Sequence, residues 1–156
     1  MAMRYQSAKA NRPASSPAWN PSGTKIAFGN GTNTTSSSVL TVDVKSHATG
    51  LFLNDAGLPA WSPNGHQIVF NTWSVAHVSL ANPDGSGRQD ITHSDSCCAD
   101  WSPDGSRIAY NMPYGGEGGV YVYDVATHES RRAAAAGFIE SWLDDHTLLI
   151  AKNSDY

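Results

Sequence analysis

The stretch Thr92–Asp100 combines several groups that could do chemistry. It holds one imidazole, two carboxylates and two neighbouring thiols, which belong to His93, Asp95, Asp100, Cys97 and Cys98. Imidazole, carboxylate and thiolate groups can all ligate metal ions, and they can equally contact a ligand directly. Adjacent side chains of a strand point to opposite sides. We therefore do not expect the two cysteines to hold one metal together, and a vicinal disulfide is the alternative.

Three interpretations of this stretch stay open, namely a metal site, ligand contact without a metal, and a purely structural polar loop. We assign His93, Asp95 and Asp100 to ligand contact, and we predict neither a metal site nor a cofactor.

Two aromatic residues add a second type of candidate. Trp73 and Tyr114 stand in short polar segments, close in sequence to Asn71, Asn111 and Glu117. A flat apolar ring with polar groups at its rim is suited to a peptide or a sugar. We therefore add Trp73, Tyr114 and Glu117 to the candidate ligand-binding residues. The alternative for Trp73 is that it folds back over its own part of the chain.

Composition excludes several classes of function. The chain has 156 residues, 40% of them hydrophobic, and a formal net charge of -4. No basic patch indicates a nucleic-acid partner, and no apolar run approaches the roughly 20 residues of a membrane helix. Met1–Ser7 has no hydrophobic signal region. The chain could therefore be cytoplasmic or a trimmed extracytoplasmic domain, and the compartment stays open.

A repeat positions all of these residues. Trp19, Trp61, Trp101 and Trp142 fall 42, 40 and 41 residues apart, and a Ser/Asn-Pro-x-Gly turn follows each of the first three. Short segments of alternating polarity come next, which predicts four antiparallel strands in each repeat. We place the repeats at 17–58, 59–98, 99–139 and, as a partial copy, 140–156, within a single domain. A period near forty with strand content is typical of propeller blades.

The sequence Trp101-Ser-Pro-Asp-Gly-Ser-Arg-Ile-Ala-Tyr110, with Val120-Tyr-Val-Tyr-Asp124 downstream, resembles the TolB-type, WD-like β-propeller repeat. This resemblance implies an all-β propeller of four-stranded blades in which the first strand of each blade lines a central channel. It also implies that the link into that strand and the loop between the second and third strands share one face. Thr92–Asp100 would then lie at the channel mouth, with the Pro-containing turns on the far face.

The chain holds about three and a half blades, whereas the family usually closes a ring of six to eight. An open arc exposes apolar blade faces and unpaired strand edges. We therefore expect copies to associate and complete the ring as a homo-oligomer, with residues 3–8 as a candidate closing strand. A fragment of a longer propeller is the alternative.

For function, the sequence favours a non-enzymatic binding propeller that recognises a protein, peptide or glycan through loops at the channel mouth. One alternative is a lyase- or cyclase-type enzyme in which His93, Asp95 and Asp100 act as acid and base. The other alternative is a structural fragment or an engineered repeat arc. Whether the chain is an enzyme stays open at this point.

Overall fold

The protein is built from short antiparallel strands. A computed structural model describes residues 14–31, 36–93, 95–113 and 118–151, and within these ranges it contains strands and turns but no helix. The strands are β1 (Ala14–Trp19), β2 (Lys25–Asn30), β3 (Ser38–Asp43), β4 (Thr49–Asn54), β5 (Ala56–Trp61), β6 (Ile68–Thr72), β7 (His77–Ala81), β8 (Gln89–Asp90), β9 (Cys97–Trp101), β10 (Arg107–Met112), β11 (Gly119–Asp124), β12 (Glu129–Ala134), β13 (Phe138–Trp142) and β14 (Leu148–Ala151).

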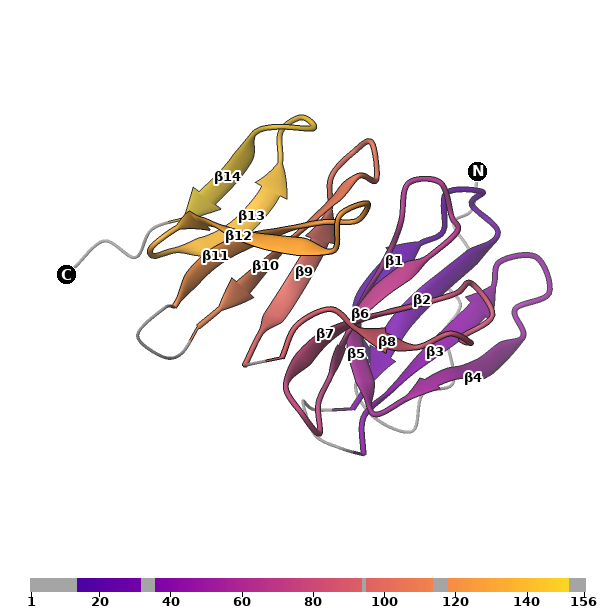
Figure 1. Cartoon of the computed structure of the whole chain (residues 1–156). Coiled ribbons are helices and arrows are strands. Elements are labelled where there is room, and N and C mark those ends of the chain that lie inside the picture. The colour runs from indigo at the N-terminus through magenta and orange to yellow at the C-terminus, as the bar shows by residue number, and fades with distance from the viewer. Residues whose placement is uncertain (1–13, 32–35, 94, 114–117, 152–156) are drawn as a thin grey trace.

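These strands form three four-stranded sheets and one two-stranded sheet, each in simple sequential order. We call β1–β4 blade 1, β5–β8 blade 2, β9–β12 blade 3, and β13–β14 the half-blade. The first strands of successive sheets are neighbours, because β1 contacts β5, β5 contacts β9 and β9 contacts β13. Figure 1 shows the sheets following one another in a row from indigo to yellow. The predicted all-β fold with four-stranded antiparallel blades is confirmed.

The Pro-containing turns are held by hydrogen bonds within the turn itself. In blade 3 the Ser102 amide donates to the Arg107 carbonyl and the Gly105 amide donates to the Ser102 carbonyl, at 2.9 and 2.8 Å. Gly105 has a φ of 72°, which explains why glycine is needed at this position. The Asp104 carboxylate accepts bonds from the Ser102 hydroxyl and the Ser106 amide and hydroxyl, which lower its pKa to about 2. Asp104 therefore stabilises the turn through these hydrogen bonds.

The core lies between blades, and β6 contributes to it from both faces. Ile68 and Phe70 join the cluster shared with blade 1, whereas Val69 joins the cluster shared with blade 3. All five residues of β6 are buried, as expected for a strand covered on both sides. Two of the repeated tryptophans belong to these clusters, Trp61 to the first and Trp101 to the second. The indole Nε1 of Trp101 also donates to the Ala60 carbonyl of blade 2 at 3.2 Å.

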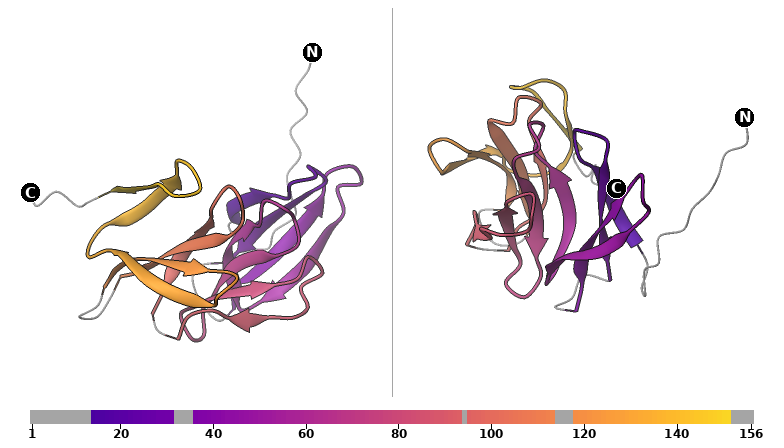
Figure 2. Two further views of the ribbon diagram at one scale, coloured as in Figure 1. Left: turned by 45° about the horizontal axis from the view of Figure 1, so that its top comes forward. Right: turned by 90° about the vertical axis from the view of Figure 1, so that its right-hand side faces the viewer.

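The two ends of the row have no neighbouring blade among the described residues. Trp19 of blade 1 is 58% exposed, whereas Trp101, at the same position of blade 3, is 6% exposed. At the other end Leu143 and Leu149 of the half-blade are exposed. The left view of Figure 2 shows blade 1 and the half-blade at opposite ends of the row.

Candidate functional site

The link from β8 to β9 is pinned at both of its ends. The hydroxyls of Thr92 and Ser96, both buried, lie 2.5 Å apart, and each accepts a hydrogen bond from the Val78 amide of β7. The Ser96 amide donates to the Ala76 carbonyl at 2.8 Å, which joins the link to the β6–β7 loop. The exposed residues His93 and Asp95 lie between these two anchors. His93 and Asp95 are therefore each exposed next to an anchored residue, Thr92 and Ser96 respectively.

His93 lies over the outer strands of blade 2. Its ring is 6.1 Å from the ring of His77, the first residue of β7, in an edge-to-face arrangement. The His77 Nδ1 atom is in turn 3.2 Å from the Asp90 carboxylate. The link crosses from the outer strand of one blade to the inner strand of the next. His93 thus stands near the start of that crossing, and Asp100 lies beyond its end, within the inner strand.

Trp73 folds over its own blade. A Cβ atom added to Gly57 of β5 would stand 2.6 Å from the Trp73 Nε1 atom, so the indole covers this glycine directly. The Trp73 side chain is half-buried, and its Nε1 atom is buried without a hydrogen-bond partner. The ring thus lies above the inner strand of blade 2, near the start of that strand.

The asparagines near the aromatic candidates have a different role from a polar rim. Asn71 and Asn111 are each 1% exposed. The Asn71 side chain donates to the Ser96 carbonyl at 2.9 Å and accepts from the Cys98 amide at 3.1 Å. Asn111 makes the same pair of bonds to Gly137 and Ile139. Each asparagine therefore clamps the entry of the next blade and is unavailable to a ligand.

The two cysteines depart from strand alternation. Cys98 has a φ of 61° and lies at a bulge, and its thiol interacts with that of Cys97. Neither cysteine forms a disulfide. The expectation that these side chains point to opposite sides of the strand is therefore wrong, because the positive φ at Cys98 departs from the strand geometry on which alternation depends.

Asp100 is the candidate with the most perturbed environment. Burial raises its pKa, and a hydrogen bond from the Trp101 amide, 3.0 Å long, only partly opposes this effect. A half-buried carboxyl with a raised pKa is suited to holding a proton. Tyr114 and Glu117 lie outside the described residues, so they stay predictions from the sequence.

Replacing Asp100 with asparagine should raise stability at neutral pH. The folded-state pKa of Asp100 lies above its unfolded value of 3.8. The wild type therefore loses stability as pH rises from that value through the raised pKa. The D100N variant cannot ionise at this position and does not lose stability in this way. Its free energy of unfolding should therefore exceed that of the wild type at pH 7, and the difference should vanish near pH 3. Urea unfolding at both pH values measures it.

The control is D104N, for which the opposite sign is expected. The pKa of Asp104 is lowered to about 2, so D104N should be less stable than the wild type at pH 7, and the difference should shrink as pH falls from 4 toward 2. A stability difference for D100N that does not change with pH would contradict the role of its ionisation.

Sequence reasoning missed a polar chain in blade 2. The Asp90 carboxylate accepts from the Ser79 hydroxyl at 2.6 Å, Ser79 contacts Thr72 at 2.6 Å, and Arg88 donates to Thr72 and to the Asn54 carbonyl. Burial raises the pKa of Asp90, but hydrogen bonds from Ser79 and His77 outweigh burial and leave the pKa below its usual value. This chain ties β8 to the link between blades 1 and 2. Nothing in the repeat pattern signalled it.

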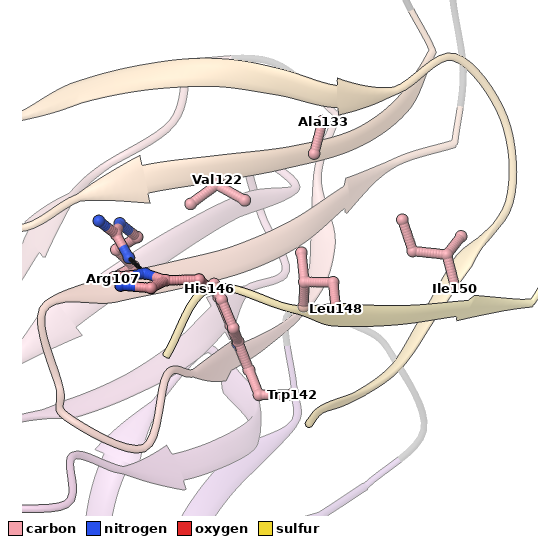
Figure 3. Close-up of a pocket in the computed structure, with 7 residues that line it drawn as sticks. All are labelled: Arg107, Val122, Ala133, Trp142, His146, Leu148 and Ile150. Carbon is pink, nitrogen blue, oxygen red and sulfur yellow. Dashed lines mark hydrogen bonds between the residues drawn. The ribbon is translucent and has the colours of Figure 1, made fainter. Parts of the chain in front are cut away.

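A groove of about 480 Å³ opens between blade 3 and the half-blade. Figure 3 shows Val122 and Ala133 of blade 3 facing Leu148 and Ile150 of β14, with Arg107 beside His146 at one end. The Arg107 Nη1 atom lies 2.8 Å from His146 Nδ1 and donates to the Asp145 carbonyl at 2.7 Å. In blades 1 to 3 the sheet continues beyond the second strand. The groove thus lies where a third strand of this blade would pack.

Comparison with solved structures identifies the fold. TolB from Acinetobacter baumannii aligns with a TM-score of 0.65 and 23% identity over 78% of this chain and 32% of its own length. A chain of a nidogen/laminin complex aligns with a TM-score of 0.65 and 11% identity, covering 81% of this chain and 50% of that chain. The fold is that of a TolB-type β-propeller. The chain forms an arc of blades, and it spans 32% and 50% of the length of these two matched chains.

The similarity of this propeller arc extends to an enzyme. An oligogalacturonate lyase in complex with manganese aligns with a TM-score of 0.61 and 18% identity, over 80% of this chain and 42% of its own. No protein-family model and no curated protein matches the chain. Among the described residues, no three His, Cys, Asp or Glu side chains form a group that could hold a metal ion. In the same part of the chain, no helix has the length and apolar character needed to cross a membrane.

Proposed function

We propose that this arc belongs to a binding propeller that captures a protein, peptide or glycan on its loop face, at the entry to blade 3. One observation supports this above all. The buried hydroxyls of Thr92 and Ser96 hold the link so that His93 and Asp95 project from it. Two polar side chains on a preorganised turn lose little freedom on binding. Trp73 adds an aromatic surface over the inner strand of blade 2.

A display experiment tests this proposal. The full chain is screened against a phage-displayed library of random peptides and against a glycan array, and the ligands obtained are measured by calorimetry. The H93A/D95A variant should bind them at least about tenfold more weakly, which is the loss expected for one or two hydrogen bonds of an exposed site. His66, an exposed residue in the Pro-containing turn of blade 2, provides the control variant H66A, which should bind like the wild type.

Two results would overturn the proposal. One is binding that H93A/D95A leaves unchanged, and the other is the absence of any ligand from both libraries. A second candidate, an acid–base enzyme, rests on the raised pKa of Asp100. Cleavage of a captured peptide or glycan, detected by mass spectrometry and lost in D100N, would favour the enzyme over the binding propeller.

We further propose that a second copy of the chain covers the open ends of the arc. The exposed Trp19 face of blade 1 and the groove beside the half-blade are two ends of one repeating stack. A head-to-tail contact between copies would bury both of them. Sedimentation velocity at several concentrations should then detect a discrete oligomer, and a monomer at all concentrations would contradict this contact.

A further inference from the structure

The two cysteines open β9, and Cys98 belongs to a bulge in that strand. Cys97 pairs with Asn111 and Asp100 pairs with Ala109, so Cys98 and Ala99 together stand opposite Tyr110. Cys98 has a φ of 61°, far from the φ of a regular strand, so the regular alternation that would separate its side chain from that of Cys97 does not apply. The two thiols lie close enough to interact. They form a single pair of sulfur donors.

The backbone of this pair is fixed from a neighbouring strand. Asn71, buried on β6, holds the carbonyl before Cys97 and the amide of Cys98. Asn111 makes the same clamp around Phe138, where no thiol is present. The clamp therefore belongs to the scaffold, and the cysteines of blade 3 use it. A donor pair that is already positioned needs little rearrangement to bind one centre.

We propose that Cys97 and Cys98 form a bidentate site for one soft, thiophilic centre, of which a trivalent arsenical is the diagnostic representative. Thiolates are the preferred ligands of soft ions. Cys98 is exposed and Cys97 half-buried, so the pair can be reached from solvent. The hydrogen bond from Cys97 lowers the pKa of Cys98, whereas the thiol contact and burial raise that of Cys97. Cys98 is therefore the first thiolate to react.

The reaction with an organic arsenoxide is balanced without any oxidant. Each thiol replaces one bond between arsenic and oxygen with a bond between arsenic and sulfur. The oxygen leaves as water with the two thiol protons. Arsenic remains trivalent, and a cyclic dithioarsenite joins the two side chains.

The test titrates phenylarsine oxide into the full reduced chain and follows the adduct by intact mass spectrometry. The wild type should bind one equivalent that resists excess mercaptoethanol and is removed by dimercaptopropanol. The variants C97S and C98S should bind at least about 100-fold more weakly, because they lose the intramolecular second bond. The C97S/C98S variant should bind none. Blade 1 carries Ser15 and Ser16 at the corresponding positions of β1, so this replacement suits the bulge.

Either of two outcomes would overturn the site. The first is wild-type binding no tighter than that of the single variants. The second is an adduct that mercaptoethanol removes as readily from the wild type as from C98S. Matched far-ultraviolet circular dichroism spectra would exclude unfolding as the cause of weak binding by the variants. The site does not depend on capture of a peptide or glycan, which His93 and Asp95 are proposed to carry.

Discussion

Replacing Trp101 with alanine is expected to lower the free energy of unfolding by about 3–5 kcal/mol, the range found when a buried aromatic side chain is truncated to alanine. Trp101 is 6% exposed, packs in the core between blades 2 and 3, and donates its indole hydrogen to Ala60. The W101A variant loses the burial of the ring and leaves a cavity at the seam between the blades. Urea unfolding followed by circular dichroism measures the loss.

The same substitution at Trp19 provides a matched control. Trp19 occupies the corresponding position in blade 1 but is 58% exposed. The W19A variant should therefore lose less than about 1 kcal/mol in the isolated chain, as usual for a surface substitution. Equal losses for W19A and W101A at low protein concentration would contradict the account of the core given above.

The Trp19 variant also reports on association. If a second copy covers blade 1, the destabilisation caused by W19A should grow with protein concentration, because only the associated state buries the ring. In sedimentation velocity, W19A should shift the chain toward monomer. If the oligomer persists unchanged in W19A, the contact does not involve this face.

Much of the fold could be predicted from the sequence because its signals repeat. The tryptophan period fixed the number of sheets, and the Pro-x-Gly turns fixed where β10 begins after β9. Both signals arise from local chemistry, since proline and glycine restrict or extend φ wherever they stand. For the same reason the aspartates of these turns could be recognised as turn residues, and the hydrogen bonds around Asp104 bear this out.

The candidate site was harder to predict because non-local geometry decides it. The bulge at Cys98 requires a positive φ, yet the corresponding positions hold Ser16 and Leu58, which also adopt positive φ without any glycine to signal it. The position of His93 depends on how the link crosses blade 2, a property that residue spacing does not contain. The clamping asparagines did leave a signal, because Asn71 and Asn111 each stand ten residues after the tryptophan of their blade, Trp61 and Trp101.

Loss of the Asn71 clamp is expected to have the second large effect on the free energy of unfolding. The N71A variant should lose about 2–5 kcal/mol of stability, because it leaves the Ser96 carbonyl and the Cys98 amide without their partner, and each unpaired buried group costs about 1–3 kcal/mol. Urea unfolding measures the loss. Faster hydrogen exchange at the Cys98 amide would localise it to the entry of blade 3.

Asn30 supplies a control, because it stands at the end of the second strand of blade 1, one position beyond the phase of Asn71, and makes no clamp. Its Oδ1 atom is buried without a partner, and its Nδ2 atom reaches the Ser38 hydroxyl only at 3.4 Å. The N30A variant should therefore lose less than about 1 kcal/mol, since little bonding is removed. An N71D variant separates the two bonds of the clamp, because a carboxylate can accept from Cys98 but cannot donate to Ser96. If N71A and N30A lose equal stability, the clamp contributes nothing, and blade 3 is held to blade 2 by its apolar seam alone.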